Sequence, residues 1–249
     1  IEEIDAHFHF TERMHAERLS MERANRIVTS TTQERLEQYG HKAYNGAIDP
    51  ADDSRFAIIP PGVNLQIFSS KETNLDSEIA SRINTAVERD ISTDRRNLPL
   101  ILASSRLDET KNHMGLVRAF AEGMALQESA NLAIVVRGLS DPLHNYQALG
   151  AGERAIMDQI IAMMRSARLE GMFCGFPLNS QLELAAAYRV LAQRSSLFAL
   201  TALYEPFGLA PLEAMSCGLP VVVTNNGGPT ESLQEANQSF GVLVDPADP

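Results

Sequence analysis

The chain has 249 residues, of which 44% are hydrophobic and 21% are charged, a composition that predicts a globular protein with a substantial core. Its formal net charge of -11 argues against general binding to nucleic acid or to an anionic membrane, because both need a basic face. No apolar run approaches the roughly 20 residues of a membrane span, so we expect neither nucleic acid nor membrane as a partner.

The two cysteines, Cys174 and Cys217, each lie in an apolar run and form no metal-spaced pair. We expect both to be buried thiols. The absence of a disulfide framework favours a reducing compartment, and we expect the protein to be cytoplasmic. The opening residues IEEIDAHFHF contain no initiator Met, and the chain stops just after a predicted strand, so we expect a fragment of a longer protein.

The first part of the chain predicts few regular elements. Apolar spacing favours a helix over residues 1–24, a strand at 27–28, a helix over 33–39 that the Ser and Thr residues at 29–32 can cap, and a strand at 56–59. Pro60, Pro61 and Gly62 then form a rigid turn. Because two strands are too few for an α/β domain, we interpret residues 1–63 as the tail of a first domain with the segment that leads out of it.

Residues 64–249 show a regular alternation of strands and helices. A helix is predicted near 75–89, strands at 100–103, 133–136, 172–176, 197–202, 220–224 and 241–244, and helices at 113–126, 153–168, 181–193, 209–217 and 228–236. The strands are continuously apolar, which is typical of strands buried on both faces. The fold class is therefore α/β, with a doubly wound, Rossmann-like parallel sheet and a partial first domain.

Ligands of open parallel sheets bind beyond the carboxyl ends of the strands, so the residues after each strand are the candidates. Arg106 and Lys111 follow the strand at 100–103 and suit a diphosphate. Pro177 and Leu178 follow the strand at 172–176 and could form an apolar wall for a flat base. The alternatives are an exposed basic loop for the first pair and an ordinary helix entry for the second.

The stretch EPFGLAPLE follows the strand at 197–202 and carries two carboxylates, Glu205 and Glu213, with Gly208 and Pro211 between them. Carboxylates accept paired hydrogen bonds from sugar hydroxyls, and the start of the following helix offers free N–H groups to an anion. We place Glu213 in the first turn of that helix. Taken alone, Glu205 could be a surface acid and Glu213 an acid favoured by the helix dipole.

Other motifs carry less functional information. Gly227 and Gly228 permit close approach of a ligand to the backbone, or only turn the chain. Glu231 is interpreted as a first-turn helix acid. His7, His9 and His15 invite a metal site, but no carboxylate or Cys completes a set, so we expect no metal and no cofactor. The sequence has no GK[ST]-type phosphate loop and no G-x-S-x-G motif.

Together the segments SSRLDETKN, FPLN, ALYEPFGLAPLEAMSCGLPVV and NNGGPTE resemble, in order and spacing, the C-terminal half of retaining glycosyltransferases of the GT-B type, which have two facing Rossmann-like domains. The chain is most similar to the sucrose-phosphate synthase family. IIPPGVN resembles the segment that joins the two domains, and RIVTSTTQER resembles the last βα unit of the first. This resemblance covers nearly the whole chain.

The resemblance implies a role for each matching position. Arg106 and Lys111 hold the nucleotide diphosphate and, with Glu205, which bonds the donor hexose, form the catalytic set. Glu213 bonds the ribose, and Pro177 and Leu178 lie against uracil. Backbone N–H groups face the hexose and phosphate at Phe207, Gly208, Leu209 and Ala210. The implied donor is UDP-glucose and the implied acceptor fructose 6-phosphate, with retention of configuration.

Acceptor recognition is where the sequence departs from the family. The family's glycine-rich loop and active-site His belong to the first half of the first domain, which has no counterpart here. Arg13 matches a basic stretch that faces the acceptor phosphate, but Glu12 stands where a second cation is expected. We therefore expect the chain alone to be inactive. A non-catalytic nucleotide-sugar-binding module, or a relative such as sucrose synthase or a mannosyltransferase, is the alternative.

Overall fold

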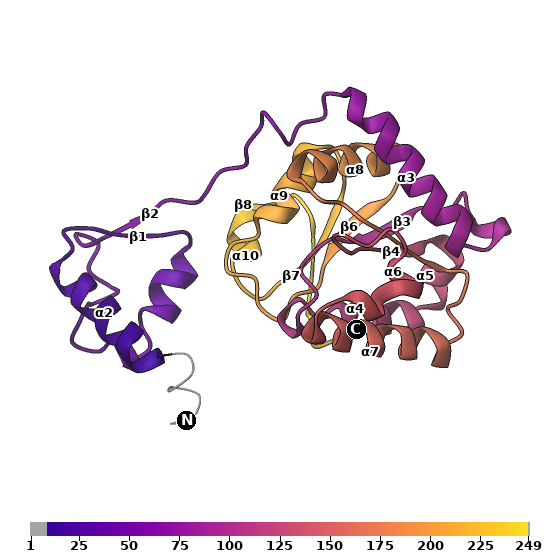
Figure 1. Ribbon diagram of the computed structural model, residues 1–249. Helices are drawn as coiled ribbons and strands as arrows, with labels where there is room; N and C mark the ends of the chain where they lie inside the picture. Colours follow the sequence, from indigo (N-terminus) through magenta and orange to yellow (C-terminus); the bar gives the residue numbers. More distant parts are fainter. Residues whose placement is uncertain (1–8, 249) are drawn as a thin grey trace. The chain divides into compact units, whose positions relative to one another are not determined.

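The computed structural model describes residues 9–248, which form two compact units divided between Pro61 and Gly62 (Figure 1). His7 lies outside the described residues. Each unit is described by itself below. Within the described residues, no helix is both long enough and apolar enough to cross a membrane.

The smaller unit contains helix α2 (Phe10–Arg23) and a two-stranded parallel sheet of β1 (Ile27–Thr29) and β2 (Phe56–Ile58). Between the strands lie the π-helical turn η1 (Glu34–Gln38) and the 3₁₀ turn η2 (Lys42–Tyr44). The predicted cap is present, because Thr31 Oγ1 accepts the amide of Glu34 at 3.0 Å while the Glu34 carboxylate accepts the amide of Ser30 at 2.6 Å. Two short strands are fewer than an independent sheet needs, so this unit has only a small core of its own.

The larger unit is built on a six-stranded parallel sheet. In chain order its strands are β3 (Leu100–Ala103), β4 (Asn131–Val135), β5 (Phe173–Phe176), β6 (Leu197–Leu200), β7 (Val221–Thr224) and β10 (Val242–Val244). Across the sheet they are ordered β10-β7-β6-β3-β4-β5. The order reverses between β3 and β6, which is the doubly wound arrangement predicted from the apolar strands.

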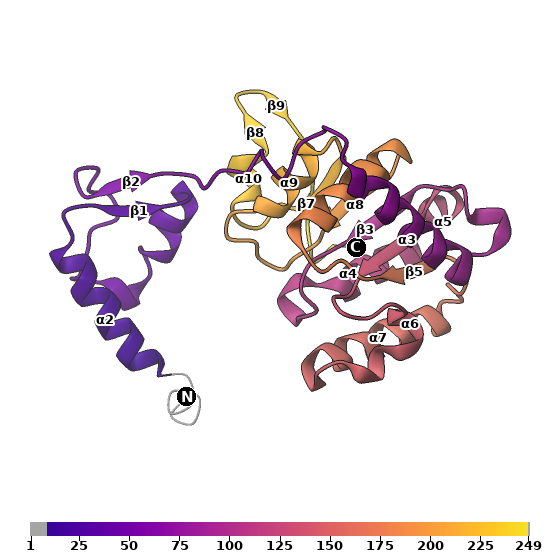
Figure 2. The same cartoon turned by 45° about the horizontal axis from the view of Figure 1, so that its top comes forward.

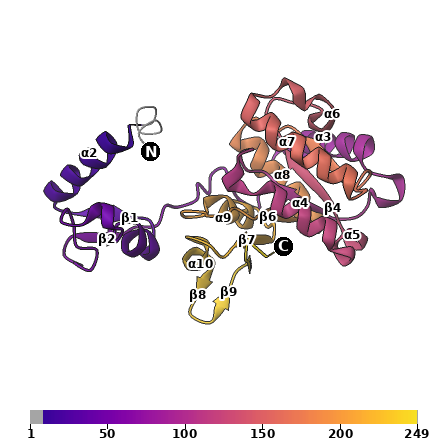
Figure 3. The same ribbon diagram turned by 90° about the horizontal axis from the view of Figure 1, so that it is seen from below.

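Helices cover both faces of this sheet. Figure 1 shows α3 (Asn74–Asp90) and α8 (Gln181–Gln193) on one side and α4 (His113–Glu122) and α7 (Ala151–Ser166) on the other, and Figure 3 shows the second side from below. Leu100 and Leu102 belong to the core under α3 and α8, whereas Ile101 belongs to the core under α4 and α7. The alternation along β3 explains why its residues are all buried: each face of the strand packs against a helical layer.

All six predicted strands are confirmed, with ends shifted by no more than two residues. The predicted helix 113–126 is instead two helices, α4 and α5 (Met124–Ser129), because the backbone of Gly123 leaves helical geometry at φ -88° and ψ 83°. Short elements complete the unit: η3 (Thr93–Arg95), η4 (Glu109–Lys111), α6 (Pro142–Asn145), η5 (Tyr146–Ala148), α9 (Leu209–Ser216) and α10 (Pro229–Ser232).

The helix predicted over 228–236 was wrong in its second half. Helix α10 ends at Ser232, and the chain then forms a hairpin of β8 (Gln234–Glu235) and β9 (Gln238–Ser239), which projects from the unit in Figure 2. Ala236 adopts φ 52°, a left-handed conformation that turns the chain and cannot continue a helix.

Both cysteines are buried free thiols, as predicted: Cys174 is 0% and Cys217 2% exposed.

Helices α3 and α8 are joined by an ion pair between Arg189 and Asp76. Arg189 is 4% exposed and donates two hydrogen bonds to the Asp76 carboxylate, at 2.6 and 2.8 Å. Its remaining bonds go to Thr73 Oγ1 and the carbonyl of Ser69. The hydrogen bonds from Arg189 hold the pKa of Asp76 below its usual value of 3.8.

We expect Asp76→Ala to lower the free energy of unfolding by about 3 kcal/mol at neutral pH, because it leaves a buried guanidinium unpaired. A carboxyl whose pKa is lower in the folded state stabilises that state at pH values above its unfolded pKa. This stability is lost as pH falls through the folded pKa. The penalty should therefore shrink once pH drops below 3.8. Urea unfolding at pH 7 and near pH 3 measures the loss of unfolding free energy in the variant. Glu78→Ala, which breaks the exposed pair with Arg82 on the same helix, is the control and should cost less than about 1 kcal/mol. An equal penalty at both pH values would contradict the assignment.

Candidate functional site

The candidate site lies at the carboxyl edge of the six-stranded sheet, where the order of strands reverses. From β3 the chain leads to β4 on one side, whereas β6 pairs with β3 on the other side. The loops that follow β3 and β6 therefore start from neighbouring strands at the place where doubly wound sheets bind ligands. Arg106 and Lys111 come from the first loop and Glu205 comes from the second.

The loop after β3 is held by its own polar contacts. Asp108 caps the 3₁₀ turn η4, since its carboxylate accepts the amide of Lys111 at 3.1 Å. His113, the first residue of α4, is 4% exposed, and its Nε2 lies 3.0 Å from the carbonyl oxygen of Arg106 and 3.1 Å from Ser105 Oγ. Burial lowers the pKa of His113 and so favours the neutral imidazole, whose Nε2 contacts the backbone of the loop.

The loop after β6 is held against the loop after β7. Glu205 donates its amide to the carbonyl of Asn226 at 3.0 Å and accepts the amide of Gly228 at 2.9 Å. A Cβ on Gly227 would lie 2.2 Å from the Glu205 carbonyl oxygen, and one on Gly228 would lie 2.5 Å from Cα of Phe207. From the sequence, these glycines either permit close approach of a ligand to the backbone or only turn the chain. In the structure, they make room for the backbone of residues 205–207.

Lys111 and Glu205 meet between the loops that follow β3 and β6, although 94 residues separate them in sequence. Lys111 Nζ lies 2.8 Å from Glu205 Oε2, and the two side chains are 16% and 14% exposed. A partly buried ion pair of this kind is held at the point where the two loops converge. It presents one cation and one carboxylate to the same small volume.

Arg106 lies on the same loop as Lys111, but its side chain points to solvent. It is 82% exposed, and its guanidinium lies 3.4 Å from Asp108 Oδ2. The structure therefore brings Lys111 and Glu205 into contact and leaves Arg106 at the rim.

Glu213 occupies a different position from the one predicted. Helix α9 begins at Leu209, after Gly208 in a left-handed conformation with φ 90°, so Glu213 lies in the second turn and no acid occupies the first. The helix begins at Leu209 as predicted, but Glu213 is its fifth residue, so the placement in the first turn was wrong. Burial raises the pKa of the Glu213 carboxyl above its usual value of 4.5. Among the described residues, nothing donates a hydrogen bond to this half-buried group.

The N-terminus of α9 is open. No side chain caps it, Pro211 has no amide hydrogen, and Gly208 stands at the N-cap. The amides of Leu209 and Ala210 have no backbone acceptor within the described part of the chain. These amides, with that of Phe207, are therefore the candidate anion-binding groups at the start of α9.

A cleft of about 370 Å³ lies beyond the carboxyl ends of β3, β4 and β5. Its lining is mixed apolar and polar: Ser104, Val135, Arg137, Leu178, Asn179, Ser180, Gln181 and Leu184. Leu178 contributes an apolar wall, as expected for a base site. Pro177 does not line this cleft, and its carbonyl accepts a bond from Arg82 at 3.2 Å. Arg137 was not singled out from the sequence and lines the cleft from the end of β4.

Arg13 belongs to the smaller unit and is exposed on α2. His9 also belongs to that unit and lies 3.5 Å from the carboxylate of Glu12. His15 is exposed on the same helix.

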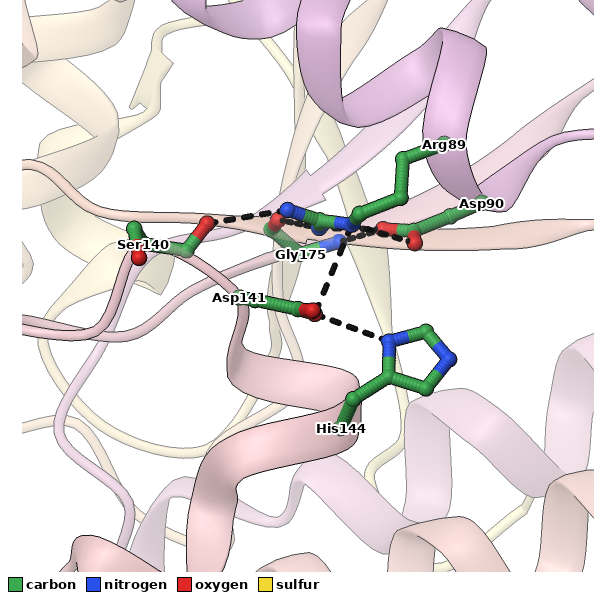
Figure 4. Close-up of polar contacts among 6 residues, drawn as sticks. All are labelled: Arg89, Asp90, Ser140, Asp141, His144 and Gly175. Carbon is green, nitrogen blue, oxygen red and sulfur yellow. Dashed lines mark hydrogen bonds and ion pairs between the residues drawn. The ribbon is translucent and has the colours of Figure 1, made fainter.

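One group of three side chains among residues 9–248 has the spacing of a metal site: Asp90, Asp141 and His144. Figure 4 shows that the guanidinium of Arg89 lies between the two carboxylates, 2.6 Å from Asp90 Oδ2 and 3.4 Å from Asp141 Oδ1. Arg89 and Asp90 also bond the carbonyl and amide of Gly175 on the edge strand β5. The two carboxylates thus already share a cation of the chain itself, and Arg89 and Asp90 bond the backbone at the edge of the sheet.

Comparison with known proteins gives the family. The family described as "Glycosyl transferases group 1" matches residues 84–249. A protein of Thermosipho melanesiensis named a probable sucrose-phosphate synthase is 37% identical over 237 residues, which cover 95% of this chain and 47% of that protein. A rice protein named probable sucrose-phosphate synthase 1 is 30% identical over 273 residues, covering 99% of this chain and 24% of its own length. This chain therefore spans less than half of these relatives.

Solved structures with the same fold are GT-B glycosyltransferases. Sucrose-phosphate synthase from Thermosynechococcus elongatus superposes with a TM-score of 0.63 at 22% identity, over 96% of this chain and 49% of that chain. Anabaena HepE in complex with UDP-glucose superposes with a TM-score of 0.65 at 20% identity, over 96% of this chain and 55% of that one. At these identities the likeness concerns the fold alone. On the match to its residues 84–249, the chain belongs to the group 1 family of glycosyl transferases.

Proposed function

We propose that the protein transfers glucose from UDP-glucose to fructose 6-phosphate with retention of configuration, giving sucrose 6-phosphate. The observation that carries the proposal is the contact between Lys111 and Glu205 at the point where the strand order reverses, in a chain of this family. The names of the relatives support the choice of acceptor and product. The complexes of HepE with UDP and UDP-glucose support the choice of donor.

In the proposed complex the diphosphate lies between Lys111, Arg106 and the N-terminus of α9. Lys111 already lies beside Glu205, whereas exposed Arg106 would turn inward from its contact with Asp108. The open amides of Leu209 and Ala210 supply further donors without a reorganisation of the backbone. These groups meet the negative charge that develops on the departing UDP as the glycosidic bond breaks.

Glu205 accepts hydrogen bonds from hydroxyls of the donor glucose. In the empty site its carboxylate is paired with Lys111, so donor binding replaces this ion pair with bonds from Lys111 to phosphate and from glucose to Glu205. Both charges therefore stay compensated when the site fills. Retention follows if the acceptor hydroxyl attacks the same face of an oxocarbenium-like sugar that the diphosphate leaves.

Glu213 accepts bonds from the ribose hydroxyls of UDP. A half-buried carboxylate with a raised pKa and no donor among the described residues is an unfavourable arrangement in the empty protein. A ribose that supplies two hydroxyl donors removes that penalty. The uracil lies in the cleft of about 370 Å³, against Leu178, while Pro177, which does not line the cleft, stays a candidate for the base site from the sequence alone.

The acceptor is recognised by residues of the first domain, and Arg13 is our candidate for its phosphate. Because this chain spans 47% of its Thermosipho relative, we expect it to bind nucleotide without turnover when alone. The second candidate function is a non-catalytic nucleotide-sugar-binding module. A related transferase with another donor or acceptor, such as sucrose synthase or a mannosyltransferase, is the remaining alternative.

Activity of the full-length protein tests the proposal directly. With UDP-glucose as donor, we expect product to form with fructose 6-phosphate and not with fructose. For this chain alone, UDP and UDP-glucose should raise the thermal midpoint more than ADP-glucose or GDP-mannose. A ligand present at 100 times its dissociation constant adds about 2.7 kcal/mol of stability. Product formation with fructose alone, or stabilisation by another nucleotide sugar only, would refute the assignment.

The two carboxylates should have separable effects on binding. We expect Glu213→Gln to weaken both UDP and UDP-glucose about tenfold, which corresponds to about 1.4 kcal/mol. Glu205→Gln should weaken UDP-glucose by a similar factor while UDP binds as well or better, because Lys111 loses its competing carboxylate. Calorimetric titration measures both constants. Glu153→Gln, an exposed acid in the first turn of α7, is the control and should change neither. A parallel loss of both ligands in the Glu205 variant would contradict its contact with the hexose.

The raised pKa of Glu213 predicts opposite effects on stability and binding. A carboxyl whose folded pKa is raised destabilises the folded state at pH values above that pKa, where it is ionised. Glu213→Gln should therefore raise the thermal midpoint at pH 7 while it weakens UDP binding. The affinity of the unchanged protein for UDP should fall as pH is lowered toward the pKa, and this pH dependence should be reduced in the variant. Calorimetry and thermal melts at several pH values test both statements, and a lowered midpoint at pH 7 would contradict them.

A further inference from the structure

Asn112 lies between Lys111 and the first residue of α4, and its side chain joins three loops at the site. We propose that Asn112 is a positioning residue, whose amide sets the place of Lys111 opposite Glu205. The inference rests on the proposed function, because it assigns a purpose to the pair that the donor is proposed to engage. Asn112 itself has no assigned contact with the donor.

The backbone of Asn112 adopts a left-handed conformation with φ 51° and ψ 42°. Asn tolerates this region better than most residues other than Gly. In this conformation the side-chain oxygen caps α4, since Oδ1 accepts the amide of Gly115 at 3.1 Å. The amide group packs so closely that a Cβ on residue 115 would lie 2.4 Å from Nδ2, which only a glycine at that position avoids.

The nitrogen of the same side chain reaches two other strands. Asn112 Nδ2 donates to the carbonyl of Thr201 at 3.0 Å and to the carbonyl of Pro246 at 3.1 Å. The carbonyl of Asn112 in turn accepts from Thr201 Oγ1 at 3.2 Å. Thr201 follows β6 and Pro246 follows β10, so this residue ties the loop after β3 to the carboxyl ends of two other strands.

A second tie lies on the other side of Lys111. The carbonyl of Thr110 accepts the amide of Leu203 at 2.8 Å. The backbone of Lys111 is therefore held by a bond at the residue before it and by bonds at the residue after it. Both sets of bonds lead to residues 201–203, directly before Glu205. The register between the two loops, and with it the 2.8 Å contact of Lys111 with Glu205, depends on this clamp.

Three substitutions separate the contributions of Asn112: its left-handed backbone, its cap on Gly115 and its bonds to the carbonyls of Thr201 and Pro246. Asn112→Gly keeps the left-handed backbone and loses every side-chain bond. Asn112→Asp keeps the backbone preference and the cap on Gly115, but places a carboxylate against the carbonyls of Thr201 and Pro246. Asn112→Ala loses both the backbone preference and the bonds. If Asn112 only stabilises α4, the Asp variant behaves like the unchanged protein.

The test measures UDP and UDP-glucose affinity of the complete chain by calorimetry. We expect Asn112→Asp and Asn112→Gly each to weaken UDP-glucose about tenfold and UDP by a smaller factor, because only UDP-glucose must contact both Lys111 and Glu205. A loss of stability alone cannot change the ratio of the two affinities. Asn131→Ala is the matched control. Asn131 is fully buried at the amino end of β4, the end away from the site, and donates to the carbonyl of Arg95. It should lower the thermal midpoint and leave both affinities unchanged.

Hydrogen exchange gives a readout that needs no ligand. In Asn112→Asp, the amide of Leu203 should exchange faster than in the unchanged protein, because its acceptor at Thr110 is no longer held in place. Unchanged exchange at Leu203, or an unchanged ratio of UDP-glucose to UDP affinity, would overturn the positioning role. Failure of the unchanged protein to bind UDP would instead refute the proposed function, and the exchange at Leu203 would still decide whether the clamp exists.

Discussion

The simultaneous parallel pairing of β3 with β4 and with β6 is the constraint on which the site depends. Ile101 pairs with Leu132 on one side and with Leu197 on the other, so β3 and β6 lie side by side and their loops leave the same edge of the sheet. Lys111 and Glu205 meet there because their loops start at adjacent strands, whatever their separation along the chain.

The site is arranged at some expense of local stability. The Glu213 carboxyl is partly desolvated without a donor among the described residues, and the N-terminus of α9 has no side-chain cap. Elsewhere in the larger unit, two ion pairs form within the fold: Arg189 meets Asp76, and Arg89 meets Asp90 beside the edge strand (Figure 4). This contrast is typical of binding sites, where groups wait for a ligand to supply bonds that the fold leaves open.

Much of the architecture could be predicted because burial on both faces leaves a direct mark in the sequence. Strands such as β3 are continuously apolar, and the helices between them carry one apolar face, so element type follows from pattern alone. The errors fall where local geometry departs from pattern. Gly123 breaks a periodic segment, and Ala236 adopts a left-handed turn for which its residue type offers no signal. Glu213 was misplaced by one turn although the helix begins at Leu209 as predicted, because it is the fifth residue from that start.

By itself, the sequence determined the fold class, the burial of both cysteines and the set of charged residues that follow each strand, because these depend on composition and on local periodicity. Only the tertiary structure decided which of those residues meet. Strand order, which no local pattern encodes, put Lys111 in contact with Glu205 and left Arg106 at the rim. The purposes of Asn112, Gly227 and Gly228 were equally hidden, since each depends on atoms that lie close in space and far apart along the chain.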